Sequence, residues 1–289
     1  EGSEYAYGDD DVGDSHRFGF DPADRYTFPK YQDYMRKDAL VMELLSSSPR
    51  AIDIYSHCAM SSVVEFAPMD MEKYIMPSAG FTPKKLIRKG SKNDHTNEPV
   101  NDHILPEEKL EIALEMAKCL ATMHGFSDGP IAHVDVQVGQ FFRGRDGFIK
   151  LVDYNRAEPL LYDAKKEEYC KWANGGVGDG TFRSPEENIN APLSEKIDVY
   201  SLGHVFYALL TGKWAREDYE YDETIHEIVE GISFPIPDVY NESPISSLLV
   251  HAIEACWTYD TESRPSIFQM VDLLEEAVAK YPVSEKAWG

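Results

Sequence analysis

The chain has 289 residues, of which 43% are hydrophobic and 12% aromatic, a composition that suits a folded globular protein with one large core or two lobes. Its 28 lysine and arginine residues stand against 51 aspartate and glutamate residues, and the net charge of −23 disfavours general binding to nucleic acid or to an anionic membrane. No run of about 18 apolar residues is present, so the sequence predicts no transmembrane segment.

Four widely spaced cysteines, without a Cys/His cluster, argue against a zinc site and against a disulfide framework. They favour reduced thiols and an intracellular location. The first residue is Glu1 rather than Met, which suggests a processed chain or a fragment, so the sequence leaves open whether a targeting segment is missing.

The N-terminal part of the chain predicts a flexible arm and a small lobe. Residues 1–20 are rich in aspartate and glycine and lack apolar periodicity, which predicts a mobile acidic arm. Residues 21–67 predict a reduced N-lobe. In this lobe, apolar residues at helical spacing predict a helix over residues 34–45, and two short apolar runs predict strands at residues 51–55 and 62–66.

The remaining residues, 68–289, predict a larger and mainly helical lobe. After a lysine-rich polar loop at residues 82–103, Pro106 and two following acids suit the first turn of a helix that continues to Gly125. Two apolar pieces flank Asp146-Gly147 and predict a hairpin. Further apolar helices are expected at residues 196–211, 244–257 and 266–279.

The most informative stretch is HVDVQVGQ at residues 133–140, followed by DYN at residues 153–155. A hairpin between them would bring their acids, Asp135 and Asp153, to one cleft. Here the sequence resembles the protein kinase family, whose catalytic loop reads H-R-D-x-x-x-x-N and whose metal loop reads D-F-G. The resemblance implies that Asp135 accepts the proton of a substrate hydroxyl and that Asp153 holds Mg²⁺.

Three later motifs extend the resemblance. GTFRSPE at residues 180–186, here called the SPE segment, resembles the family's A-P-E segment, DVYSLG resembles the start of its buried helix, and RPS resembles its late arginine segment. The resemblance implies that Glu186 and Arg264 form a buried ion pair, that Asp198 anchors backbone N–H groups near His133 or Val134, and that His133 has a structural role. It implies an α+β, two-lobed protein kinase-like fold with a reduced N-lobe and a mainly helical C-lobe.

The resemblance also implies a nucleotide site, with ATP and Mg²⁺ as cofactors if the chain binds nucleotide. VVEFA resembles the hinge strand, so Glu65 and Ala67 are expected to meet adenine through their backbone. Glu43 lies where the family's helix C glutamate belongs and is expected to face Asp153. Gln140 stands at the metal-binding Asn and is expected to hold Mg²⁺ beside Asp153.

Several positions depart from an active kinase. Val134 replaces the arginine of H-R-D, so a phosphate on the activation segment would lack its usual cationic partner. Gln137 stands where the family carries a lysine that neutralises the transferred phosphoryl group. Gln140 is longer than Asn by about 1.5 Å. No G-x-G-x-x-G loop or V-A-I-K strand precedes Glu43, so we expect no lysine of this chain within ion-pair reach of Glu43.

These departures favour a catalytically impaired, pseudokinase-like protein that acts as a binding or scaffold module for a protein partner. The alternative is an active atypical protein kinase that transfers the γ-phosphate of ATP to a protein hydroxyl. In that case Asp135 is the base, Asp153 and Gln140 bind Mg²⁺, and the missing lysine comes from sequence outside this chain. A kinase-like fold that phosphorylates a small molecule is a third hypothesis.

Overall fold

The computed structural model describes residues 27–77, 101, 103–173, 180–217 and 219–283. The predicted acidic arm and nearly all of the lysine-rich loop at residues 82–103 lie outside the described residues. Of the helices described, none is both long and apolar enough to cross a membrane.

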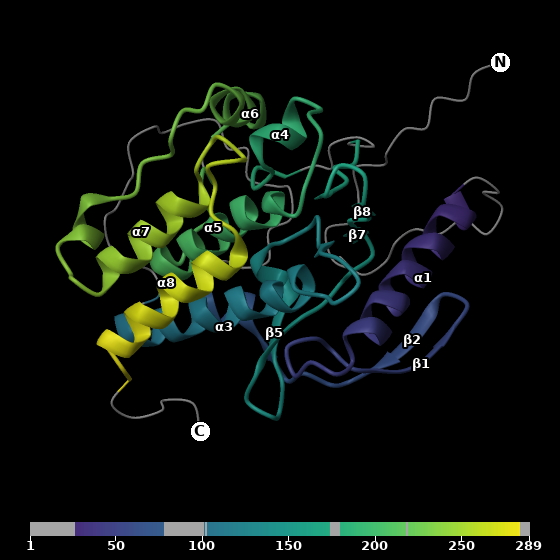
Figure 1. Cartoon of the computed structure of the whole chain (residues 1–289). Helices are drawn as coiled ribbons and strands as arrows, with labels where there is room; N and C mark the ends of the chain where they lie inside the picture. The colour runs from purple at the N-terminus through teal and green to yellow at the C-terminus, as the bar shows by residue number, and fades with distance from the viewer. Residues whose placement is uncertain (1–26, 78–100, 102, 174–179, 218, 284–289) are drawn as a thin grey trace, which may run out of the picture.

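The small lobe consists of one helix and one hairpin, to one side of the helical body in Figure 1. The predicted helix is confirmed as α1 (Thr27–Leu45), and the predicted strands are β1 (Ile54–Cys58) and β2 (Ser61–Val64), which pair antiparallel. The first strand begins later than predicted because Ala51 is buried and forms a parallel bridge with Leu151 of the large lobe. Among the described residues this sheet has two strands.

Four helices form the body of the large lobe, and the sequence predicted each of them. They are α3 (Pro106–His124), α5 (Lys196–Thr211), α7 (Ser246–Cys256) and α8 (Ile267–Lys280). The predicted start of α3 is confirmed, with Pro106 and two acids in its first turn. α5 ends at Gly212, whose φ of 74° is the left-handed conformation that glycine adopts without a Cβ clash.

Shorter elements connect these helices. The short helices are α2 (Met71–Ile75), α4 (Pro185–Asn188) and α6 (Tyr221–Val229), and 3₁₀ turns lie at Val138–Gln140 and Asp238–Asn241. Short strands pair β4 (Ile131–Ala132) with β7 (Glu158–Pro159) and β8 (Tyr162–Asp163) with β9 (Glu168–Tyr169). The sequence did not predict α6 or the β8–β9 hairpin.

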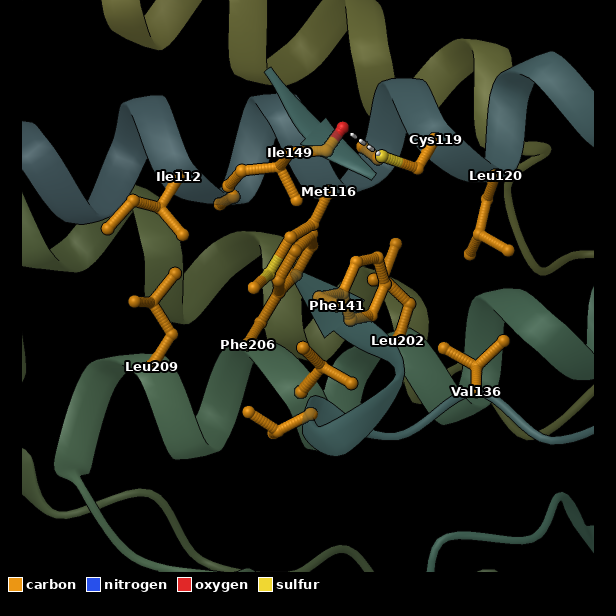
Figure 2. Close-up of a cluster of buried hydrophobic side chains, with 14 of the residues drawn as sticks. Ile112, Met116, Cys119, Leu120, Val136, Phe141, Ile149, Leu202, Phe206 and Leu209 are labelled. Atoms are coloured by element: carbon orange, nitrogen blue, oxygen red, sulfur yellow. Dashed lines mark hydrogen bonds between the residues drawn. The ribbon is translucent and has the colours of Figure 1, made fainter. Parts of the chain in front are cut away.

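The core of the large lobe lies between α3 and α5, as Figure 2 shows. Apolar side chains of the two helices meet there, and the buried ones include Ile112, Met116 and Leu120 of α3 with Leu202, Phe206 and Leu209 of α5. Burying a side chain of this size contributes roughly 1.5–3 kcal/mol. Phe141 also enters this core, and Cys119 Sγ donates a hydrogen bond of 3.1 Å to the carbonyl of Ile149, so the neighbouring hairpin is anchored on α3.

That hairpin is the predicted one. It is formed by β5 (Phe141–Arg143) and β6 (Ile149–Leu151), with β3 (Met69–Asp70) added beside β5. Its turn contains Gly147, whose φ of 86° confirms the turn predicted at Asp146-Gly147. The hairpin carries the chain from the end of the catalytic loop at residues 133–140 to the metal loop at residues 153–155.

The same hairpin also fastens the hinge segment that follows β2. The Lys150 ammonium lies 3.0 Å from Glu65 Oε2 and 3.0 Å from Asp146 Oδ2, and its side chain is only 3% exposed. The guanidinium carbon of Arg145 lies 5.4 Å from the centre of the Phe66 ring, within cation–π range. Charge and aromatic contacts therefore join the end of the small lobe to the large lobe.

Candidate functional site

The structure brings together the residues predicted at the catalytic and metal loops. Gln140 Nε2 donates a hydrogen bond of 3.3 Å to Asp153 Oδ2, across the β5–β6 hairpin. Burial raises the pKa of Asp153, and the nearby negative charge of Asp135 adds to this rise. Gln137 precedes the 3₁₀ turn, and its carbonyl accepts a bond of 3.0 Å from the Gln140 N–H.

Asp198 binds backbone N–H groups of the catalytic loop, as predicted. Its carboxylate, at the start of α5, accepts hydrogen bonds of 2.6 Å from the His133 N–H and 2.8 Å from the Val134 N–H. His124 Nε2 lies 2.9 Å from the same carboxylate. Val134 has a φ of 68°, an unfavourable conformation for a β-branched residue, so these bonds hold a strained backbone in place.

His133 connects this loop to the strand that leads into the metal loop. Its Nε2 lies 3.0 Å from the carbonyl of Val152, and its Nδ1 accepts a bond of 3.3 Å from the Asp135 N–H. The ring is completely buried. These contacts fit the predicted structural role, because the imidazole spaces the two loops.

The predicted ion pair between Glu186 and Arg264 is confirmed. Arg264 donates to the two carboxylate oxygens of Glu186 at 2.6 and 3.1 Å, and both side chains are buried. The same guanidinium donates to the carbonyls of Thr258, Lys196 and Tyr259. Arg264 thereby ties α4 to α5 and to the segment before α8.

The expectation that Glu43 faces Asp153 is wrong. The Glu43 side chain is exposed, whereas Asp38 Oδ1 accepts a hydrogen bond of 2.7 Å from the Tyr154 N–H in the metal loop. The buried stripe of α1 carries Val41, Met42 and Leu45, and Asp38 precedes them at spacings of three, four and seven residues. Leu40 and Leu44, two other apolar residues of α1, are exposed.

The carboxyl group of Asp38 is electrostatically unfavourable when ionised. Burial raises its pKa from 3.8 to about 6, and the charge of Asp153 contributes to the rise. Within the described residues no lysine pairs with Glu43, while Lys37 pairs with Glu158 at 2.8 Å. α1 therefore places the Asp38 carboxyl group against the metal loop, and no cation of the described residues forms an ion pair with it.

We expect Asp38→Asn to become more stable relative to the wild type as the pH rises. The folded protein binds more protons than the unfolded chain between about pH 4 and 6, so the wild type loses stability through this range. Asn accepts the same backbone bond without ionising. The relative gain between pH 4 and pH 7 should be about 1–3 kcal/mol, measured by urea unfolding. A gain equal to that of the exposed control Asp33→Asn would contradict this account.

The side chain of Glu65 faces the large lobe rather than a nucleotide. Its carboxylate is engaged by Lys150, and its N–H donates a bond of 2.8 Å to the carbonyl of Asp53. Ala67 is half-buried and packs against the core. Both residues were expected to contact adenine through their backbone atoms. The ion pair with Lys150 uses the Glu65 carboxylate and does not involve the Glu65 carbonyl.

Arg183, in the SPE segment, is a residue that the sequence analysis missed. Its Nη2 donates to Asp135 Oδ1 at 3.0 Å, and its Nη1 donates to the Val134 carbonyl at 2.6 Å and to Glu187 Oε1 at 3.2 Å. The side chain is 2% exposed. A buried cation is therefore bound to the acid that was predicted as the catalytic base.

Comparison with known proteins decides the family. A family model described as the protein kinase domain matches residues 42–274. The chain belongs to the protein kinase family. This kinase-family chain is 28% identical to wall-associated receptor kinase 5 of Arabidopsis thaliana over 207 residues, which cover 66% of this chain and 27% of that protein.

Relatives from other organisms share the same region. Serine/threonine-protein kinase Nek4 of Mus musculus is 29% identical over 165 residues, 57% of this chain and 19% of Nek4. Dual specificity protein kinase shkE of Dictyostelium discoideum is 22% identical over 179 residues, 61% of this chain and 24% of that protein. The kinase-family chain thus spans about a quarter or less of the length of these relatives.

Proposed function

We propose that this kinase-family chain is catalytically impaired and acts as a binding or scaffold module for a protein partner. The observation that carries the proposal is the charge of the site. Around the reacting positions, the described side chains provide three acids, Asp38, Asp135 and Asp153, and the neutral amide of Gln140, while the buried cation Arg183 is already bound to Asp135. Phosphoryl transfer depends mainly on positioning and on stabilising negative charge, and a site with excess acid is poorly suited to that task.

Nucleotide binding is compatible with the same residues. The carboxylate of Asp153 and the amide oxygen of Gln140 are the oxygen donors that Mg²⁺ prefers, and Mg²⁺ usually takes one or two carboxylates with phosphates and waters. Among the described residues, no group of three His, Cys, Asp or Glu side chains could hold a metal alone. Mg²⁺ bound by Asp153 and Gln140 would take its remaining ligands from waters and from the phosphates of ATP, whose γ-phosphate is the group that kinases transfer.

The second candidate function is an active atypical protein kinase. The observation that favours it is the position of the two acids, because Asp198 holds the catalytic loop and Asp135 lies close enough to Asp153 for its charge to raise the pKa of Asp153. In this case Asp135 accepts the hydroxyl proton of a protein substrate, and a lysine from outside the described residues neutralises the phosphates. The named activities of the relatives, serine/threonine or dual specificity, belong to those proteins and give no preference here.

Transfer from radiolabelled ATP to a generic protein substrate, and to the chain itself, tests the two candidates. We expect a rate far below the roughly 1–100 s⁻¹ of ordinary protein kinases. Asp135→Asn and Asp153→Asn should leave this background unchanged, as should the exposed control Asp128→Asn. Robust transfer that both site substitutions abolish and the control preserves would establish the active kinase instead.

A thermal shift with ATP, with and without Mg²⁺, separates nucleotide binding from transfer. ATP at about 100 times its Kd would stabilise the protein by roughly 2.7 kcal/mol. A shift that needs Mg²⁺ and disappears in Asp153→Asn would assign the metal to Asp153. A module that has lost nucleotide binding altogether would show no shift under either condition.

A further inference from the structure

The catalytic loop of this chain lacks the two cations that kinases commonly carry there, but Arg183 of the SPE segment contacts the loop. Val134 and Gln137 stand where kinases commonly carry arginine and lysine, and neither has a charge. Arg183 comes from the SPE segment, 48 residues after Asp135, and donates to the Asp135 carboxylate. The position and the contacts of this arginine define what it can do.

Burial excludes direct contact between Arg183 and a transferred phosphoryl group. The side chain is 2% exposed, and its guanidinium carbon lies 4.9 Å from the centre of the Phe182 ring. Asp135 is 16% exposed and accepts from Arg183 through Oδ1, while Oδ2 accepts no hydrogen bond from the described residues. Arg183 can therefore act on a substrate only through Asp135, and it is a positioning residue rather than a catalytic one.

Arg183 and Asp198 together bind both backbone polar groups of the strained residue Val134. The N–H of Val134 is bound by Asp198, and the carbonyl of Val134 is bound by Arg183, so both polar groups of this residue are fixed by opposite charges. Its φ of 68° persists only if the surroundings determine it strongly. The same guanidinium holds Glu187, whose other oxygen accepts from the Ser184 N–H at 2.8 Å at the start of α4.

We propose that Arg183 joins the catalytic loop to the SPE segment and fixes both without phosphorylation. A phosphate on an activation segment orders it by pairing with arginine side chains. Here the arginine lies within the segment, and the anions it binds are permanent side chains, Asp135 and Glu187. The proposal concerns the regulation of the proposed site, but it holds for an impaired and for an active kinase alike.

Hydrogen–deuterium exchange of the full chain after phosphatase treatment tests this proposal. In the wild type we expect slow exchange in peptides covering residues 131–142 and 180–190. Arg183→Met should raise exchange in both peptides by at least about tenfold and leave α8 unchanged, because the partly buried Asp135 and the buried Glu187 both lose this cation. Arg183→Lys should give an intermediate result, since lysine keeps the charge but loses the planar fork of donors.

Two further variants separate positioning from general loss of stability. Arg50→Met is the matched control, because Arg50 binds the carboxylate of Glu115 on α3 with two hydrogen bonds, at 2.7 and 3.0 Å, rather than the catalytic loop or the SPE segment. It should leave both peptides at the wild-type rate. The double variant Arg183→Met with Asp135→Asn should exchange more slowly at residues 131–142 than Arg183→Met, because the unpaired charge is removed.

The proposal is overturned by fast exchange in the phosphate-free wild type, by wild-type rates in Arg183→Met, or by equal loosening in Arg50→Met. If Arg183→Met does not fold, Arg183→Lys decides, and a wild-type rate in both peptides then overturns the proposal. Transfer from ATP tests the proposed function and exchange tests Arg183, so each can fail without the other.

Discussion

Arg264→Ala is expected to lower the free energy of unfolding by about 3–5 kcal/mol, the cost of removing one partner from a buried ion pair. The substitution leaves the Glu186 carboxylate buried, with its two bonds to the guanidinium lost. Three backbone carbonyls lose a donor as well. Urea unfolding with the slope compared between variants would measure the effect.

The matched control is Arg36→Ala. Arg36 pairs with Asp33 at 3.4 Å, but both side chains are largely exposed, so we expect a change within about 0.5 kcal/mol. Glu186→Gln should fall between the two, because the amide keeps an acceptor for Arg264 and removes the stranded charge. An Arg264→Ala protein as stable as the wild type would show that the pair does not hold α4 against the large lobe.

Asp198→Ala is expected to lower the free energy of unfolding by about 2–6 kcal/mol. The substitution leaves the N–H groups of His133 and Val134 without their acceptor, and each buried unpaired donor costs about 1–3 kcal/mol. It also removes support from the strained φ of Val134. Thermal and urea unfolding would both report the loss.

Val134→Gly distinguishes these two causes. Glycine adopts a positive φ without a Cβ clash, so the loop needs less support in that background. We therefore expect Asp198→Ala to cost less in Val134→Gly than in the wild type, by about 1 kcal/mol or more. If Asp198→Ala lowers the free energy of unfolding equally in both backgrounds, the hydrogen bonds of Asp198 do not serve to hold the strained φ of Val134.

Local sequence signals were sufficient for the helical body and for the central hairpin. α3 could be predicted because Pro106 and the acids after it mark a first turn, and an apolar face follows at helical spacing. Gly147 marked the hairpin turn, because a positive φ is required there. α6 (Tyr221–Val229) was missed because it is short and begins with acidic residues, although Tyr221, Ile225 and Ile228 lie at helical spacing along it.

The site was predictable where a family motif fixes the position, and less so elsewhere. Asp135, Gln140 and Asp153 were found from the motif, but Glu43 was chosen from its place on the helix alone. The buried stripe of α1 contains the signal for Asp38, since Asp38 lies three and four residues before Val41 and Met42. No local pattern indicates the contact between Arg183 and Asp135, because it depends on how two distant segments pack.

The fastened hinge has a practical consequence for shortening the protein. The sequence suggests residue 68 as the start of the larger lobe, and an expression version trimmed there would lose Glu65 and Phe66. Lys150 would then keep one of its two acids in a buried position, and Arg145 would lose its aromatic partner. A fragment that retains residues from 50 onward would preserve these contacts, together with the bonds from Arg50 to Glu115. The lobe boundary that the sequence suggests at residue 68 is thus a poor position for truncating the protein.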